Sequence, residues 1–306
     1  HTGSSLLENF INDIADSWKC SICIGSGNEG AGSSPYRRNA DRRYGRKRLS
    51  LLLAVMKRDS VSRYGKITGT ILPWKSLRRP AEIWGGFRRT AVSAGSVMKI
   101  WNCLHILENL RRLGFDQEIY IDMIPQTVYI QSGLWKFRLI PRSIRNGRYD
   151  MWLPAQGALN FGTGFTSPDS ASTFTIPSAA AKAVTVGAYD AGTGSAAPFS
   201  GRGYIVEIGG SLMVKPELAA PGVNVLVPSV SGMARVNGTS YATPFVTGSA
   251  ALLMEWGIVR GNDAFLYGEK LKAYLIKGAE PLAGAAVPDT QTGWGRLCLK
   301  NSLPQA

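Results

Sequence analysis

The feature that most constrains this chain is a glycine-led turn that opens a long apolar segment near the C-terminus. It reads Asn237-Gly238-Thr239-Ser240-Tyr241-Ala242-Thr243-Pro244, and an apolar run continues through Trp256. This pattern predicts a buried helix that begins at Ser240, with Pro244 in its first turn, where the missing N–H costs little. A serine there presents its Oγ outward, with the N–H groups of the helix N-terminus behind it. These donors suit an oxyanion that forms beside the hydroxyl, so we interpret Ser240 as a nucleophile; the alternative is a helix cap that uses serine.

Length and composition exclude several classes of protein. The 306 residues allow one large or two medium domains with a sizeable core. No apolar stretch reaches 18 residues and the N-terminus has no signal-peptide pattern, so neither a transmembrane helix nor a leader is expected. Four cysteines give no disulfide framework. Cys20 and Cys23 form a Cys-x-x-Cys, but residues 18–24 alternate like a strand and no second ligand pair follows, which favours a buried strand over a zinc or redox site.

The net charge of +14 is concentrated in one block. Residues 36–112 hold 19 Lys and Arg against 4 Asp and Glu, and the rest of the chain is nearly balanced. One interpretation of the block is a disordered basic arm that binds nucleic acid. Against it, the block contains Trp74, Trp84 and Trp101, which solvated arms usually lack.

A second interpretation of the basic block is a shifted reading frame. With synonymous codons read one base out of step, residues 47–71 can encode a peptide that alternates like a β-strand. The hypothesis is tested by the nucleotide sequence. If it holds, the basicity of residues 36–112 has no functional meaning, and we expect neither a nucleic acid nor a membrane as partner.

The remaining chain shows α/β layering around a β-rich insertion. An amphipathic helix is expected near the N-terminus, with Leu6, Leu7, Phe10, Ile11 and Ile14 on one face, followed by the strand at 18–24. Half-buried antiparallel strands are expected at 118–124, 127–130 and 134–139. Further on, residues 183–188 and 223–226 are expected to form buried strands, and residues 264–277 a helix with Leu266, Leu271, Tyr274 and Leu275 on one face.

A glycine-rich loop, Gly25-Ser26-Gly27-Asn28-Glu29-Gly30, follows the first strand. Its glycines match the Gly-x-Gly-x-x-Gly spacing of dinucleotide sites. That site needs a helix directly afterwards and an acidic residue about 20 positions on. Ser33, Ser34 and Pro35 follow instead, so nucleotide binding is not favoured.

Several segments together resemble the subtilisin-like serine proteases (subtilases). The turn at 237–244 resembles their nucleophile motif and Gly27-Asn28-Glu29-Gly30 their oxyanion-hole motif. Three other stretches are also similar to subtilases in general: Thr185 to Ala188, Ala197 to Gly203 and Lys215 to Gly222. Four more are similar to the germination-protease (Csp-like) branch of spore-forming bacteria: Tyr149 to Pro154, Met254 to Ile258, Leu266 to Gly268 and Gly293 to Cys298.

The resemblance implies a fold and a division of the chain. The expected fold class is α/β, part of a subtilisin-like three-layer sandwich with a parallel sheet and an inserted antiparallel, jelly-roll-like β domain. Residues 1–35 would be a core segment with the oxyanion asparagine, 36–165 the inserted domain, including the suspect block 36–112, and 166–306 the core segment with the nucleophile.

The resemblance also implies a serine endopeptidase that acts on proteins or peptides. Ser240 would attack the peptide carbonyl, and the Asn28 side chain and the Ser240 N–H would bind the oxyanion. Subtilases order their triad Asp, His, Ser, and no Asp or His motif precedes Asn28, so this chain alone is expected to be inactive. The alternatives are an inactive pseudoprotease that binds a partner protein, and a basic nucleic-acid-binding protein.

No cofactor is expected. Calcium is common in subtilases, but the sequence shows no cluster of ligands for it. The resemblance implies a bacterial protein that is extracellular or spore-associated.

Overall fold

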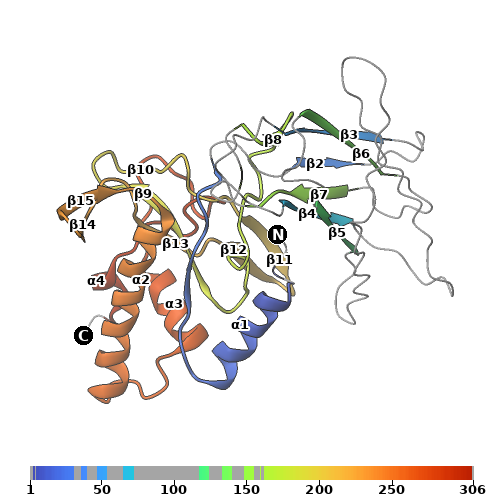
Figure 1. Ribbon diagram of the computed structural model, residues 1–306. Coiled ribbons are helices and arrows are strands. Elements are labelled where there is room, and N and C mark those ends of the chain that lie inside the picture. Colours follow the sequence, from blue (N-terminus) through green and yellow to red (C-terminus); the bar gives the residue numbers. More distant parts are fainter. Residues whose placement is uncertain are drawn as a thin grey trace, which may run out of the picture. The chain divides into compact units, whose positions relative to one another are not determined.

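The computed structural model describes residues 3, 5–30, 148–154, 159 and 162–304, with the strand segments 36–39, 47–53, 65–71, 117–123 and 133–139. The chain forms two compact units (Figure 1). One unit joins His1–Gly32 to Ser170–Ala306, and the other is Ser33–Asp169. The first unit holds both predicted site residues.

A parallel sheet lies at the centre of the first unit. Its middle strand is β9 (Val184–Asp190), which pairs in parallel with β1 (Cys23–Gly25) and with β13 (Leu218–Pro221). A two-residue strand, β10 (Ser195–Ala196), extends it antiparallel. Six successive residues of β9 are buried, as expected for a parallel strand covered on both faces. The prediction of a buried strand at 183–188 is confirmed.

The core helix α2 (Thr239–Met254) packs against this sheet and continues into a π-helical turn, η2 (Glu255–Val259). Its sheet-facing residues are buried: Ala242, Val246, Ala250 and Leu253. The predicted helix is confirmed, but it begins at Thr239 with Gly238 as N-cap. Pro244 is the sixth residue of α2 and so lies in its second turn, not in the first as expected.

The joined helix Thr239–Val259 is also long and apolar enough to cross a membrane by length and composition. A core helix of a soluble protein meets the same criteria. Its contacts with β1, β9 and β13 identify it as a core helix of the first unit. One third of its most apolar window is buried, which leaves much of its surface uncovered.

Helix α1 (Leu6–Ser17) begins with a capping box. Ser5 Oγ accepts a hydrogen bond from Glu8 N at 3.2 Å, and Glu8 Oε2 accepts one from Ser5 N at 2.9 Å. The N-terminal helix is thus confirmed. The strand expected at 18–24 is wrong in extent, because a turn at Trp18 and Lys19 follows the helix and β1 begins only at Cys23.

Two further helices complete this unit. They are α3 (Gly268–Gly278) and the short α4 (Leu299–Ser302). Leu266, Leu271 and Leu275 are fully buried and Tyr274 partly, so the predicted apolar face is confirmed. The helix itself begins four residues later than position 264.

Two hairpins precede α2. The first joins β11 (Tyr204–Ile208) to β12 (Ser211–Lys215), and the second joins β14 (Val225–Ser229) to β15 (Gly232–Val236). The buried strand predicted at 223–226 is wrong. Its second half, from Val225, belongs to the second hairpin, whose first strand has no fully buried residue, and Leu226 is 54% exposed.

The second unit contains two antiparallel sheets among its described strands. One has the order β2 (Tyr36–Asn39), β7 (Arg148–Trp152), β4 (Gly65–Ile71), β5 (Gln117–Met123); the other has β6 (Gly133–Leu139), β3 (Lys47–Leu53), β8 (Gly164–Phe165). The strands expected at 118–124 and 134–139 are confirmed, and 127–130 lies outside the described residues. The jelly-roll topology and the shifted reading frame stay predictions.

Candidate active site

Ser240 is the second residue of α2 and its side chain is exposed, whereas Gly238 and Thr239 are buried. Gly238 has a φ of +151°, a conformation that favours glycine. In the first helical turn, Thr239 N–H donates to Asn28 and Tyr241 N–H to the Gly238 carbonyl. Ser240 N–H donates to no residue that the structure describes. The serine thus carries an exposed hydroxyl beside an available backbone donor at the positive end of a helix.

Asn28 comes from 211 residues earlier in the chain and is fixed to the start of α2. Its Oδ1 accepts the Thr239 N–H at 2.9 Å and the Thr239 Oγ1 hydroxyl at 3.1 Å. Both bonds use the amide oxygen, so the amide NH₂ is the end left for a ligand. This end lies next to Gly238, where an added Cβ would come within 3.4 Å of Nδ2. The structure therefore brings the two predicted site residues, Asn28 and Ser240, to the same helix end.

The loop that carries Asn28 is interlocked with the loop after β10. Gly30 N–H donates to Phe199 O at 2.8 Å, and Gly201 N–H donates to Gly27 O at 2.9 Å. A Cβ on Gly30 would lie 2.0 Å from the Ser200 carbonyl oxygen, and one on Gly201 would lie 2.2 Å from that of Ser26. Gly30 and Gly201 are required by close backbone packing, so the last glycine of the dinucleotide-like spacing is explained without a nucleotide.

No general base for Ser240 is found in the part of the chain described. The two histidines of the sequence, His1 and His105, lie outside it. The thiol of Cys23, on the strand that leads to the Asn28 loop, is no substitute, because burial raises its pKa and disfavours the thiolate. The described residues also contain no group of three or more His, Cys, Asp or Glu that could hold a metal ion.

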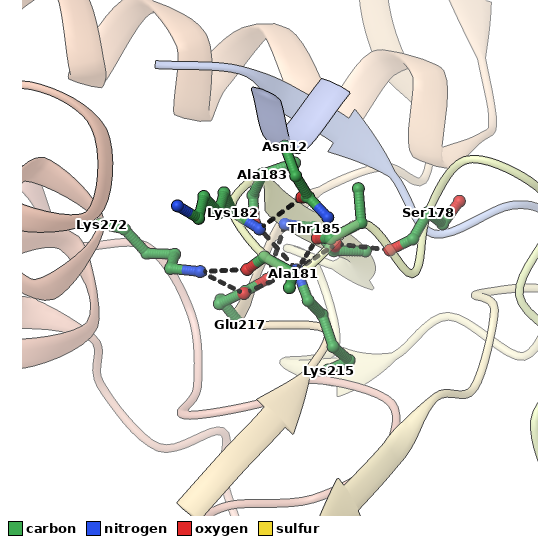
Figure 2. Close-up of polar contacts among 10 residues, drawn as sticks. Asn12, Ser178, Ala181, Lys182, Ala183, Thr185, Lys215, Glu217 and Lys272 are labelled. Atoms are coloured by element: carbon green, nitrogen blue, oxygen red, sulfur yellow. Dashed lines mark hydrogen bonds and ion pairs between the residues drawn. The ribbon is translucent and has the colours of Figure 1, made fainter. Parts of the chain in front are cut away.

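A buried charge cluster, which the sequence did not indicate, lies at the starts of β9 and β13 (Figure 2). Glu217 Oε1 forms ion pairs with two lysines: it lies 2.7 Å from Lys215 Nζ and 3.1 Å from Lys272 Nζ. Glu217 Oε2 accepts the Thr185 N–H at 2.7 Å. Lys215 also donates to the carbonyls of Ala180 and Ala183 and to Thr185 Oγ1, at 2.7, 2.8 and 3.0 Å.

This cluster ties the strands of the site together. Lys215 has no exposed surface and Glu217 is 3% exposed. Burial lowers the pKa of Lys215 to about 8, and the opposing charge of Glu217 limits the drop. Ser178, in the segment before β9, continues the network: its Oγ donates to Gly25 O at 2.7 Å, and its carbonyl accepts from Thr185 Oγ1 at 2.6 Å. The network thereby connects β13, β9 and β1, the strand that leads into the Asn28 loop.

The fold and the site define an α/β protein with a serine at the N-terminus of a core helix and an asparagine amide beside it. Comparison with protein families gives a match to the subtilase family (Peptidase_S8) over residues 143–295, half of the chain. The chain therefore belongs to the subtilase family. The core described above is a subtilisin-like fold of helices packed on a parallel sheet.

Solved structures agree with this assignment. The chain is 30% identical to the Clostridium perfringens CspB protease, with a TM-score of 0.74 over 99% of this chain and 62% of that one. It is 29% identical to the prenylagaramide maturation protease PagA over 43% of this chain and 45% of that one, with a TM-score of 0.35. The second superposition is too partial to bear on the fold. Comparison with curated protein sequences gives no significant match.

Proposed function

We propose that this chain carries the nucleophile and the oxyanion hole of a subtilisin-like serine endopeptidase. Ser240 Oγ attacks the carbonyl of a peptide substrate to form an acyl-enzyme, and Asn28 Nδ2 and the Ser240 N–H donate to the tetrahedral oxyanion. The observation that carries the proposal is the double hydrogen bond from Thr239 to Asn28 Oδ1. It turns the donor end of the amide outward, one residue from the nucleophile.

The two donors are preorganised, which is what stabilises a developing charge. Asn28 is held by Thr239, and the Ser240 N–H is fixed by the helix. In a subtilisin, removal of the equivalent side-chain donor costs about 10²–10³ in kcat. We expect a loss of that order for Asn28→Ala once a base is supplied.

The base is the part that the chain does not supply in its described residues. A serine without a base is a weak alcohol, so we propose that the chain alone has no appreciable peptidase activity. The chain spans 62% of the CspB protease, and the activity of a complete enzyme is part of this proposal. A spore-associated bacterial location is the expectation from the resemblance to that branch.

The test uses a fluorophosphonate probe, with labelling of Ser240 measured by mass spectrometry. Without an added base, labelling should be slow, and millimolar imidazole should accelerate it by acting as the base. Ser240→Ala should abolish the signal and Asn28→Ala should reduce the imidazole-dependent rate about 100-fold. A complete subtilisin treated in parallel reports full reactivity.

Two outcomes count against the proposal. Rapid labelling of Ser240 without imidazole would mean that the chain has its own base. Labelling no faster than in Ser240→Ala at any imidazole concentration would remove the nucleophile and leave a pseudoprotease that binds a partner protein.

A further inference from the structure

The peptide group that links Gly25 to Ser26 is held on both of its sides. Its N–H belongs to Ser26 and donates to Val186 O of β9 at 2.9 Å. Its carbonyl belongs to Gly25 and accepts the Ser178 hydroxyl at 2.7 Å. Because a peptide group is planar, these two bonds fix the direction in which the chain leaves β1 toward Asn28.

Gly25 also packs directly against the helix end that carries the site. A Cβ on Gly25 would come within 3.0 Å of Thr239 Oγ1 and 3.2 Å of Thr243 Oγ1. Thr239 is the residue whose N–H and hydroxyl both bind Asn28 Oδ1. A displacement of Gly25 therefore changes the separation between the Asn28 loop and the start of α2, and with it the direction of the Asn28 amide.

Ser178 has a single orientation, because each of its polar groups has a partner. The residue is 1% exposed. Its N–H donates to Thr175 O at 2.7 Å, and its carbonyl accepts the Thr185 hydroxyl at 2.6 Å (Figure 2). With both backbone groups fixed in this way, the side chain donates its one hydroxyl hydrogen to Gly25 O.

A buried ammonium group sets the direction of these bonds. Lys215 Nζ donates to Thr185 Oγ1 at 3.0 Å, and an ammonium group can only donate. The Thr185 hydroxyl therefore directs its own hydrogen to Ser178 O. Hydrogen bonds are stronger in a low-dielectric interior, and a buried polar group that loses its partner is costly. This row of bonds thus holds Ser178 firmly against Gly25.

We propose that Ser178 is a positioning residue of the oxyanion hole. It acts through the Gly25–Ser26 peptide, which it holds so that the Asn28 loop stays against Thr239 and the Asn28 amide stays where the oxyanion forms. The inference rests on the proposed function, because the position of Asn28 affects the reaction only if its amide binds the oxyanion.

Removal of the Ser178 hydroxyl releases one side of this peptide. In Ser178→Ala the Gly25 carbonyl loses the donor, whereas the bonds of Ser26 N–H and Gly27 O still hold the loop. A misplacement of about 1 Å costs on the order of 10²-fold in rate, and loss of a whole oxyanion donor costs about 10²–10³-fold. Because the loop is only partly released, we expect a loss of about tenfold, below that of Asn28→Ala.

The experiment measures the imidazole-dependent labelling of Ser240 by a fluorophosphonate probe over a range of probe concentrations. Ser302→Ala is the matched control for Ser178→Ala, because Ser302 is also a buried serine, 3% exposed, whose hydroxyl donates to a backbone carbonyl, that of Cys298 at 3.0 Å. Ser302 lies in α4, which packs on α3. Ser178→Cys keeps a weak donor at the same position, and it takes the place of Ser178→Ala if that variant does not fold.

Ser178→Ala should lower the maximal labelling rate about tenfold, with no change in the probe concentration that gives half of that rate. Ser178→Cys should fall between Ser178→Ala and the parent, and Ser302→Ala should equal the parent. In an Asn28→Ala background, Ser178→Ala should cause no further loss, because Ser178 acts through the Asn28 amide. A general weakening of the core would lower the rate in both backgrounds.

Three results would overturn the inference and leave the proposed function standing, provided that Asn28→Ala by itself lowers the rate. They are equal rates for Ser178→Ala and Ser302→Ala, a loss that persists in the Asn28→Ala background, and a change in the half-saturating probe concentration alone. If Asn28→Ala leaves the rate unchanged, the proposed function fails, and the role of Ser178 fails with it.

Discussion

Replacing Glu217 by glutamine should destabilise the core of the first unit, because it leaves the Lys215 ammonium buried without its counter-ion. The carboxylate lies 2.7 Å from Lys215 Nζ, and neither side chain exceeds 4% exposure. Removing one partner of a buried pair costs about 3–5 kcal/mol. We expect about 3 kcal/mol here, at the lower end, because the carbonyls of Ala180 and Ala183 and Thr185 Oγ1 still accept from the ammonium.

Thermal unfolding of the whole chain measures this loss. For a unit of this size about 1 kcal/mol corresponds to 2–4 °C, so Glu217→Gln should lower the Tm by roughly 6–12 °C. The matched control is Glu280→Gln, which removes an ion pair to Arg296 at 2.8 Å. The side chains of Glu280 and Arg296 are 34% and 47% exposed. Exposed pairs contribute little, so its Tm should stay within error of the parent.

A double variant separates the buried charge from other causes. Lys215→Met with Glu217→Gln removes both charges, and such replacements are often neutral. It should therefore be more stable than Glu217→Gln alone. The reasoning is refuted if Glu217→Gln and Glu280→Gln lower the Tm equally. It is also refuted if the double variant is less stable than Glu217→Gln, with a loss equal to the sum of the losses of the two single variants.

Three further predictions concern the core and the site. The pKa of Lys215 is about 8 in the folded chain and near 10.5 when unfolded, so between these values the unfolded chain binds more protons and the contribution of this group to stability rises with pH. The unfolding free energy of the parent minus that of Lys215→Met should accordingly grow from pH 8 to 10. A difference that stays constant over this range would contradict the lowered pKa of Lys215. Gly201→Ala should cost about 1–3 kcal/mol, because its Cβ would meet the Ser26 carbonyl oxygen at 2.2 Å. Gly248→Ala, with nothing within 4 Å of its added Cβ, should stabilise α2 by about 0.5–1 kcal/mol. Urea titrations of both variants measure these effects, and a Gly248→Ala variant less stable than Gly201→Ala would contradict the packing argument. With imidazole supplied as the base, Asn28→Ala should lower the maximal rate of probe labelling at Ser240 about 100-fold with little change in the probe concentration that gives half of that rate, and an effect on that concentration alone would exclude an oxyanion role.

The juxtaposition of Asn28 and Ser240 could be predicted from the resemblance to the subtilases, because each residue lies in a segment similar to one of the family's motifs. The parallel strand at β9 and the core helix α2 were also predictable from continuous apolar runs. The roles of Asn28 and Ser240 in catalysis stay predictions, since contacts place the residues but do not measure chemistry.

Other features could not be predicted, because they depend on what packs on a segment. Residues 223–226 were expected to form a buried strand, but Val225 and Leu226 lie in a hairpin strand with no fully buried residue. The apolar residues of α1 do share a face, and that face is uncovered. The sequence contains one indication of the cluster of Lys215, Glu217 and Lys272: the charged residues Lys215 and Glu217 flank Pro216 just before a buried strand. Nothing local indicates that Lys272 meets them.

The bond between Asn28 and Thr239 has a mechanical consequence. Because the asparagine is hydrogen-bonded to the residue beside the proposed nucleophile, a small shift of the start of α2 would carry both proposed oxyanion donors together. The spacing between Asn28 Nδ2 and the Ser240 N–H is then set by two hydrogen bonds to one threonine, and not by the alignment of distant loops. Small fluctuations of the surrounding core would then move the proposed oxyanion hole as a single piece, without changing the gap into which a substrate oxygen would have to fit.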